Sequence, residues 1–417
     1  MAFMVNDMMF LRHAARLRSG WFQKTRDLPD AYPESRGISK RALSKQENPH
    51  LGRARRRSRV RIAVSARSLL LTAAISLNAA CAWSETLRVA TFNTGLERKG
   101  PALLLRDIVR GEDAQIEAVA SVLTTIAPDI VALQSFDYDL TGAALSAFSK
   151  VLRDVGLDYP YQFAALPNTG MRTDLDMDGN RRRAEARDAQ GYGFFSGQGG
   201  MAILSKYPIV TDEVQDFSSM LWRDFPGALL PQTAAGPFPS EQAQAIQRLS
   251  TTGHWVVPVD VPGLGRVTLM TLHASPPVFD GPEDRNGKRN HDEIVFWQRY
   301  LDGSFGPAPD RQFVLLGDFN QDPVDGEGLK NAIRSLISDP RLQDVEPTST
   351  GSAEATGDPF DTADWDDPVP GNMRVDYVFP SSDWRVQEAG VYWPSGPAGV
   401  VAQTASRHRL VWVDLAR

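Results

Sequence analysis

Cysteine is almost missing from this chain of 417 residues, which contains a single one, Cys81. One cysteine cannot form an intramolecular disulfide or a thiolate zinc site. Long apolar runs are missing as well, since the apolar stretch at 68–77 is too short to cross a bilayer comfortably. With 42% hydrophobic and 23% charged residues, the composition is that of a globular protein rather than a disordered or membrane protein.

The first 85 residues differ in composition from the rest of the chain. Seven arginines lie between residues 53 and 67, and the apolar stretch and a series of small residues up to Ala82 follow them. This order is typical of a secretory signal. We predict a basic leader over residues 1–85, with its apolar part at about 68–82, and a secreted or periplasmic protein. A lipid anchor at Cys81 is the less favoured alternative, because Asn78 stands where lipoprotein signals carry leucine.

Positive charge becomes scarce beyond this leader. Residues 1–82 contain 16 Lys and Arg against 5 Asp and Glu, and the other 335 residues contain 29 against 46, a net charge of −17. A surface with this charge repels polyanions at long range. We therefore expect no strong general affinity for nucleic acid.

Several predicted strands in residues 86–417 end in polar side chains. Ligands of open α/β sheets bind at the carboxyl ends of the strands, so these side chains are candidates for a site. A helix predicted at 112–127 connects the first two strands, 86–93 and 130–134, into a β–α–β unit. The polar residues are Asn93 at the end of the strand at 86–93 and His273 at the end of the strand at 265–273. Asp318 and Asn320 follow the strand at 313–317.

Seven short segments occur along the chain in this order: Phe92-Asn93, Pro128-Asp-Ile-Val-Ala-Leu-Gln134, Gly200-Met-Ala-Ile-Leu-Ser-Lys-Tyr-Pro-Ile209, Leu272-His273, Gly317-Asp-Phe-Asn320, Arg374-Val-Asp-Tyr377 and Ser406-Arg-His-Arg409. Their order resembles the endonuclease/exonuclease/phosphatase superfamily. The likeness covers roughly residues 86–417 and implies one α/β domain of two packed mixed β-sheets flanked by helices, in four layers. It also implies an enzyme that cleaves phosphoester bonds with a divalent metal, usually Mg²⁺, or Mn²⁺.

Hydrolysis of a phosphodiester needs an in-line nucleophile, a base that deprotonates it and cations that stabilise the phosphoryl oxygens. The resemblance implies that His408 is the general base and that Asp376 fixes its tautomer and raises its basicity. By the same resemblance, His273 and Asn320 bind the non-bridging oxygens, Asp318 positions or protonates a reacting oxygen, and Asn93 lies at the metal.

Two positions depart from the family pattern. The family usually carries Glu directly after Leu-Gln and Asp directly before the final His, whereas this chain has Ser135 and Arg407. The local formal charge changes by about +3, a large perturbation even at an effective dielectric of roughly 20. Three outcomes stay open. Asp137 or Asp139 replaces the missing metal ligand, Arg407 clamps the phosphate in place of the metal, or the protein is a degenerate enzyme that binds a phosphorylated ligand without turnover.

A loop between the motifs matches a calcium-binding pattern. Asp174, Asp176, Asp178 and Glu185 occupy positions 1, 3, 5 and 12 of the twelve-residue calcium loop, and Gly179 occupies position 6. Three arginines inside the loop and the lack of a strong entering helix count against bound Ca²⁺. A solvated acidic loop is the alternative. A calcium-stabilised surface protein without turnover is a further, weaker reading of the whole chain.

The segment 276–291 is predicted to be a polar loop with three cations, Arg285, Lys288 and Arg289. We expect this loop, through Arg285 and Asn290, to recognise a substrate phosphate; a plain solvated loop is the alternative. The remaining pattern predicts helices at 292–301 and 328–337, an irregular excursion at 215–253, and strands at 375–379 and 410–415.

Overall fold

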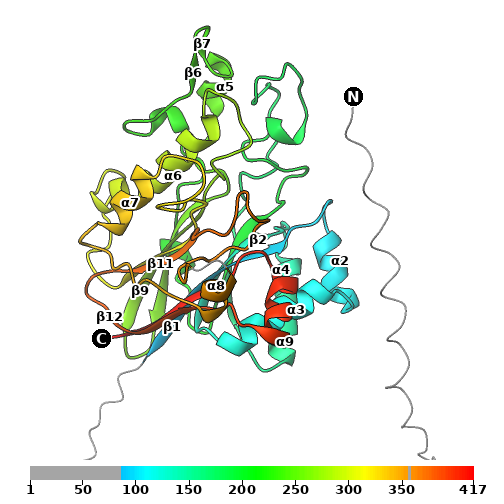
Figure 1. Ribbon diagram of the computed structural model, residues 1–417, viewed down its shortest axis with the longest axis vertical. Coiled ribbons are helices and arrows are strands. Elements are labelled where there is room, and N and C mark those ends of the chain that lie inside the picture. Colours follow the sequence, from blue (N-terminus) through cyan, green and yellow to red (C-terminus); the bar gives the residue numbers. More distant parts are fainter. Residues whose placement is uncertain (1–85, 356–357) are drawn as a thin grey trace, which may run out of the picture. The chain divides into compact units, whose positions relative to one another are not determined.

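The computed structural model of the protein describes residues 86–355 and 358–417 (Figure 1). The leader predicted for residues 1–85, with its signal and Cys81, lies outside the described residues. Among the described residues, no helix combines the length and the apolar character that crossing a membrane requires.

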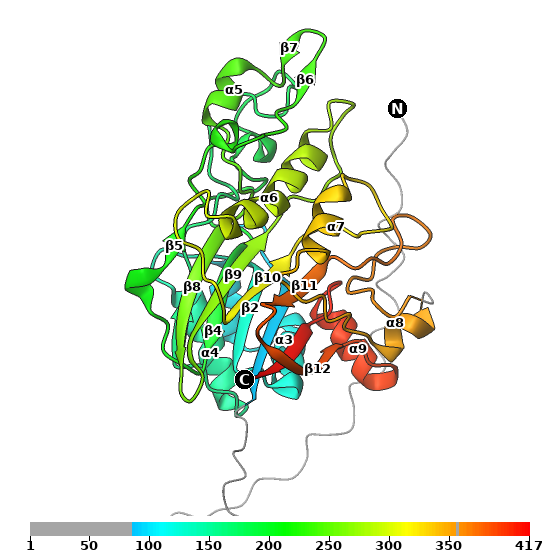
Figure 2. The same ribbon diagram turned by 90° about the vertical axis from the view of Figure 1, so that its left-hand side faces the viewer.

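Two mixed β-sheets form the centre of the domain (Figure 2). The six-stranded sheet has the order β12 (Arg385–Val391), β13 (Val411–Ala416), β1 (Leu87–Leu96), β2 (Ile130–Phe136), β4 (Gly200–Ser205) and β3 (Tyr161–Phe163). The five-stranded sheet has the order β11 (Asp376–Pro380), β10 (Phe313–Asp318), β9 (Gly265–His273), β8 (His254–Val261) and β5 (Gln215–Asp216). The pairs β1–β2 and β9–β10 are parallel, and the other pairs are antiparallel.

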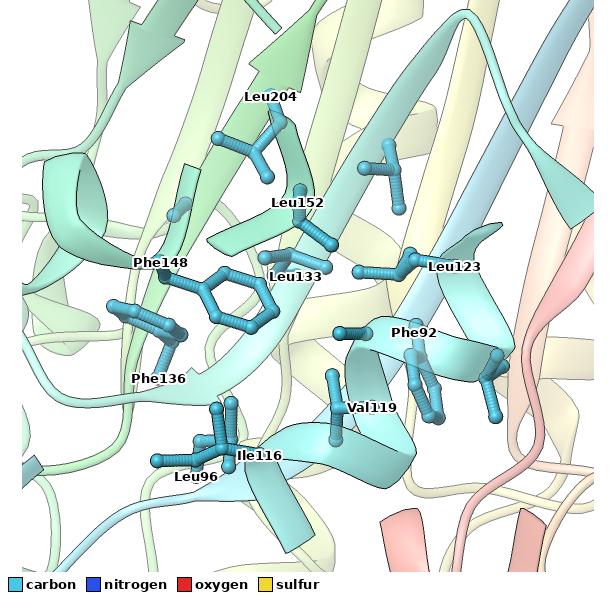
Figure 3. Close-up of a cluster of buried hydrophobic side chains, with 14 of the residues drawn as sticks. Phe92, Leu96, Ile116, Val119, Leu123, Leu133, Phe136, Phe148, Leu152 and Leu204 are labelled. Atoms are coloured by element: carbon cyan, nitrogen blue, oxygen red, sulfur yellow. The ribbon is translucent and has the colours of Figure 1, made fainter. Parts of the chain in front are cut away.

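Helices cover the outer face of each sheet. An apolar cluster joins the six-stranded sheet to α2 (Leu103–Arg110), α3 (Ala114–Ile126), α4 (Ala143–Asp154) and α9 (Gly396–Ala405). In this cluster, Phe92 and Leu133 of the sheet pack with Ile116, Leu123 and Phe148 of the helices (Figure 3). A second cluster joins the five-stranded sheet to α6 (Arg285–Leu301) and α7 (Asn331–Ile337). Shorter elements, α5 (Glu241–Ile246), α8 (Thr350–Ala355) and the hairpin β6 (Gln232–Thr233) and β7 (Gly236–Pro237), lie in the connections.

The third apolar cluster lies between the two sheets. It takes alternate residues from the long strands of both sheets, such as Leu87 and Val89 of β1 and Val314 and Leu316 of β10. Because side chains of a strand alternate between its faces, the residues between them join the outer clusters instead. The helix–sheet–sheet–helix arrangement confirms the predicted fold class of two packed mixed sheets flanked by helices.

Two connections differ from their predicted structure. The helix predicted at 292–301 begins earlier, at Arg285, so all three cations expected in a loop lie on α6. Asp280 accepts a hydrogen bond from the first-turn N–H of Asn286, which fixes this earlier start. The excursion at 215–253 contains β5, a 3-10 helix at Trp222–Asp224, the β6–β7 hairpin and α5.

Replacing Leu316 by alanine should lower the free energy of unfolding by about 2–5 kcal/mol, because the side chain is fully buried between the sheets and its loss leaves a cavity. Urea denaturation followed by circular dichroism measures the change. Leu140, whose exposure is 89%, is the matched control, and its replacement by alanine should change stability by less than about 0.5 kcal/mol. Equal losses in the two variants would contradict this assignment of the core.

Candidate active site

Four strands deliver polar side chains to one edge of the space between the sheets. On β1, β9, β10 and β11, one face packs apolar residues into the core between the sheets. Because every second residue of a strand lies on the same face, a polar residue continues this inner face toward the end of β1, β9 and β10 and at the start of the antiparallel strand β11. These residues are Asn93 on β1, His273 on β9, Asp318 on β10 and Asp376 on β11.

The register of the five-stranded sheet sets three of these residues side by side. Asp318 pairs with His273 of β9 on one side and with Asp376 of β11 on the other. Gly317 permits this close pairing: a Cβ at this position would lie 2.1 Å from the carbonyl oxygen of Leu272, and its φ is 150°. A larger residue at position 317 would therefore push β9 and β10 apart.

Hydrogen bonds join the site across the two sheets. Asn93 Nδ2 donates to Asp318 Oδ2 at 2.8 Å, and His273 Nε2 lies 3.4 Å from the same oxygen. His408, which precedes β13, places Nδ1 2.9 Å from Asp376 Oδ2. Its Nε2 lies 3.5 Å from Asn93 Nδ2. The structure thus brings Asn93, His273, Asp318, Asp376 and His408 into one connected group.

Asn320 lies at the margin of this group. Its N–H donates to Asp318 Oδ1, and its Nδ2 donates to the carbonyl oxygen of Ala274, both at 2.9 Å. Its backbone has a φ of 50°, a left-handed conformation that asparagine tolerates better than most residues. Asn320 therefore ties the end of β10 to the residue that follows His273.

Two residues outside every motif, Thr362 and Trp365, support the His408–Asp376 pair. The hydroxyl of Thr362 donates to Asp376 Oδ2 at 2.9 Å and accepts the N–H groups of Val375 and Asp376. The ring of Trp365 meets the His408 ring edge to face, with centroids 5.4 Å apart. Ala363 forms a bridge with His408, a pairing between distant segments that no local pattern in the sequence reveals.

Burial and charge act in opposite directions on the two histidines. Burial alone would lower the pKa of His408, but the carboxylates of Asp376 and Asp318 raise it to about 9. Burial lowers the pKa of His273, against the opposing effect of Asp318. Burial raises the pKa of Asp376 to about 6, against the effect of His408. At neutral pH the site therefore contains a protonated His408 beside a neutral His273.

If neutral His408 is the base, the rate of hydrolysis at a fixed, saturating metal concentration should rise with pH up to about 9. The neutral fraction, and with it kcat/KM, grows roughly fiftyfold between pH 7 and pH 9 for such a pKa. The stability that His408 contributes has the opposite dependence: it is complete below the unfolded pKa near 6.5 and is lost as the pH rises through 9. A pH–rate profile, corrected for the His408→Ala background, measures the first effect; a plateau from pH 7 upward would contradict it.

The family model described as "Endonuclease/Exonuclease/phosphatase family" matches residues 90–408, which contain the whole group. The chain belongs to this family. Enzymes of the family hydrolyse phosphoester bonds. A comparison with curated proteins gives no match.

Three solved structures illustrate what this chain is similar to. An endonuclease/exonuclease/phosphatase from Beutenbergia cavernae is 22% identical, with 79% of this chain and 71% of that chain covered and a TM-score of 0.47. Sphingomyelinase C from Streptomyces griseocarneus is 19% identical, with 80% and 100% covered and a TM-score of 0.40. The human Nocturnin catalytic domain with bound sulfate is 13% identical, with 79% and 94% covered and a TM-score of 0.41.

The acids proposed to replace the family's missing glutamate are held by backbone groups. Asp139 accepts N–H bonds from Thr141, Ala143 and Ala144, and so caps the start of α4. Asp137 is buried, and its oxygens accept the N–H groups of Arg98 and Gly199. Burial raises the pKa of Asp137 to about 6. Asp139 therefore has a structural role, whereas Asp137 lies close to Ser135 with one backbone partner on each oxygen.

Arg407 lies at the rim of the family's site. Its side chain is 59% exposed and lies 3.4 Å from Asp366, which is itself 84% exposed. A surface pair of this kind contributes little to stability. The guanidinium is thus accessible to an incoming anion.

The residues present fit a divalent cation held mainly by oxygen ligands. Asp318, Asp376 and His408 offer ligand atoms that lie within 4.8 Å of one another. Asp376 Oδ1 is buried and has no hydrogen-bond partner, so a cation or a proton would satisfy it. Carboxylate and carboxamide oxygens are the ligands that Mg²⁺ prefers. Position 135 contributes only a hydroxyl.

The calcium-loop segment forms an acidic cluster with a different membership from the pattern. Asp176 and Asp178 are joined by Asp188, and these oxygens lie within 4.8 Å of one another. Asp174 does not belong to this cluster. Glu185 instead begins the 3-10 helix at Ala186–Asp188, where its N–H donates to Asp188 Oδ2. The cluster could hold a cation, but with Asp188 in place of the first and twelfth positions.

The residues expected to bind phosphate from the 276–291 segment contact protein backbone instead. Arg285 Nη1 donates to the carbonyl oxygen of Met177, and Arg289 donates to Leu249 and Ser250. Asn290 is fully buried and donates to the carbonyl oxygens of Ser275 and Phe319, each at 2.8 Å. Asn290 therefore joins the segments that follow His273 and Asp318. It holds these two residues in place without contacting a ligand itself.

Glu293, one turn along α6 from Asn290, completes this attachment. Its oxygens accept the N–H of Thr251 at 2.5 Å and of Ser275 at 2.6 Å, and burial raises its pKa to about 7. Glu293→Gln should lower the free energy of unfolding by about 1–3 kcal/mol, because the amide NH₂ must face one of the two N–H donors. Chemical denaturation measures the loss. Glu388→Gln, on an exposed residue of β12, should change it by less than about 0.5 kcal/mol; a loss no larger in Glu293→Gln would contradict the assignment.

Proposed function

We propose that the protein is a metal-dependent phosphodiesterase that acts on small or exposed phosphoesters. The observation that carries the proposal is the contact of 2.9 Å between His408 Nδ1 and Asp376 Oδ2, beside Asp318, Asn93 and His273. A histidine oriented by a carboxylate, next to further polar groups that can contact a phosphoryl oxygen, is the arrangement that general-base hydrolysis requires.

Each residue has a distinct task in this reaction. Asp376 holds the proton of His408 on Nδ1, so Nε2 is the atom that accepts a proton from the attacking water. Thr362 fixes the Asp376 carboxylate. Asp318 orients Asn93 and lies beside His273, which is neutral and can donate to a phosphoryl oxygen. A bound Mg²⁺ or Mn²⁺, held by Asp318 and Asn93, would supply positive charge for the phosphoryl oxygens.

Charge and the leader suggest where and on what the enzyme acts. The net charge of −17 beyond residue 82 disfavours a long polyanion as the substrate. The predicted signal in residues 1–85 favours action outside the cytoplasm, either secreted or in the periplasm. A small phosphodiester or an exposed phosphoester fits both features.

The second candidate is a protein that binds a phosphorylated ligand without turnover. Ser135 and Arg407 favour it, because one removes a metal-ligating carboxylate and the other adds an accessible cation at the rim. Arginine holds a phosphate through paired hydrogen bonds without help from a metal.

Hydrolysis of bis-p-nitrophenyl phosphate by the purified full-length protein, stripped of metal and then titrated with Mg²⁺, Mn²⁺ or Ca²⁺, separates the two candidates. The enzyme predicts turnover that requires added metal. Turnover without metal would assign the role of the cation to Arg407. Background rates with this and several other phosphoesters, together with phosphate binding that is lost in Arg407→Ala, would establish the binding protein and overturn the proposal.

A further inference from the structure

The end of β2 leaves the proposed metal site short of a carboxylate. Ser135 has a φ of 54° and lies where the pairing of β2 with β4 shifts register, between Leu133 and Phe136, and its side chain carries no charge. Asp139 caps α4, and each oxygen of Asp137 is engaged by a backbone N–H. Mg²⁺ and Mn²⁺ bind through carboxylates, with a serine hydroxyl a poor substitute. A carboxylate from another element is therefore needed.

Glu97 brings a carboxylate to this place from the neighbouring strand. It follows directly on β1, whose last residue, Leu96, pairs with Phe136 of β2. A Cβ built on Gly199 would lie 3.7 Å from Glu97 Cβ and 4.0 Å from Ser135 Cα. Glu97 Cβ, just after β1, and the backbone of Ser135, on β2, therefore both lie beside Gly199.

The charge of Glu97 reaches groups of both sheets. It adds to the burial that raises the pKa of Asp137, directly after β2 of the six-stranded sheet. It also opposes the burial that lowers the pKa of His273, on the five-stranded sheet. Asp137 is bound to the N–H of Arg98, the residue after Glu97. The side chain of Glu97 is exposed, and within residues 86–355 and 358–417 its carboxylate makes no hydrogen bond or ion pair. It is thus both close to the site and free to bind.

We propose that Glu97 supplies, from the end of β1, the metal-ligating carboxylate that Ser135 on β2 does not provide. The inference rests on the proposed function in one respect: the ion that Glu97 would bind is the Mg²⁺ or Mn²⁺ proposed there. Glu97 stands next to Arg98, whose N–H binds Asp137, and Asn93 lies four residues before it, on β1.

Binding of Mn²⁺, followed by electron paramagnetic resonance of the full-length protein, tests the inference without any turnover. All variants carry Asp178→Asn, which removes the second acidic cluster as a competing site. Glu97→Gln keeps the size of the side chain and removes its charge. Glu112→Gln, on an exposed glutamate between α2 and α3, is the matched control. Ser135→Glu, combined with Glu97→Gln, returns a carboxylate from the β2 side.

Glu97→Gln is expected to weaken Mn²⁺ binding by at least about tenfold, a loss that even an outer-shell partner can cause. Glu112→Gln should bind like its background, and adding Ser135→Glu should restore the affinity of Glu97→Gln. Unchanged binding in Glu97→Gln, an equal loss in Glu112→Gln, or no Mn²⁺ binding in the background would overturn the inference. Binding through Glu97 without phosphodiester turnover would support it and overturn the proposed function instead.

Discussion

His408→Ala is expected to lower kcat/KM for a soluble phosphodiester about a thousandfold, within the range that loss of a general base produces. His408 is the residue whose ring is held by Asp376 at 2.9 Å, supported by Thr362 and covered by Trp365. Alanine leaves Asp376 in place but removes the atom that accepts the proton. Because substrate contacts to other residues stay intact, kcat should fall far more than KM rises.

His291→Ala is the matched control for this loss. His291 is also partly buried and paired with an aspartate, since its Nδ1 lies 2.9 Å from Asp292 Oδ1, but it lies on α6 outside the connected group. Steady-state rates with bis-p-nitrophenyl phosphate at pH 9 measure both variants. Retention of more than about a tenth of the activity in His408→Ala would rule out general-base catalysis by this residue.

Much of the site is predictable because it depends on the same period as the core. The alternation of Val314 and Leu316 on the inner face of β10 continues to Asp318, and the same rule aims Asn93 and His273. A reader of the sequence can therefore locate these side chains without knowing the contacts. The family resemblance adds His408 and Asp376, whose partnership joins segments far apart in the chain.

The other contacts depend on tertiary pairings that no local pattern encodes. Asp139 could be read as a metal ligand from its position after β2, but the helix start beside it takes both its oxygens. The polar segment that contains Arg285 and Asn290 predicts a loop, but both residues lie on α6. They donate hydrogen bonds to the backbone of Met177, Ser275 and Phe319. The buried face of α6 is therefore partly polar. Only the packing of the helix shows which backbone groups these side chains satisfy.

Glu97 shows the same limit at the proposed metal site. Its position after β1 is visible in the sequence, yet an exposed glutamate after a strand is ordinary. Glu97 becomes a candidate metal ligand because it lies beside Ser135 and Gly199. These residues come together because β1 and β2 are parallel neighbours and β2 pairs with β4. A substitution that seems to remove a function from one strand can thus be offset by the adjacent strand.

Asp318→Asn is expected to lower kcat/KM by at least about a thousandfold. The substitution disturbs the hydrogen bonds that fix the site geometry and also removes a charge used in catalysis. Asp318 Oδ2 accepts Asn93 Nδ2 at 2.8 Å and lies 3.4 Å from His273 Nε2. An asparagine has one oxygen and one NH₂ group, so it cannot replace both carboxylate oxygens, since Oδ1 also accepts the N–H of Asn320. The variant also removes a negative charge that would hold a cation.

The same substitution should lower the pKa of His408 below its value of about 9, because the Asp318 carboxylate is one of the two charges that raise it. The protonated ring is then less stable, and His408 becomes neutral at lower pH. NMR titration of the histidine rings, with His408→Ala to assign the signal, measures this shift independently of the rate. Asp325→Asn, on an exposed residue of the loop after β10, should leave both the rate and the titration unchanged. If the rate is lost but the pKa of His408 does not change, the prediction is wrong. Asp318 would then act on the substrate or a cation without raising the pKa of His408.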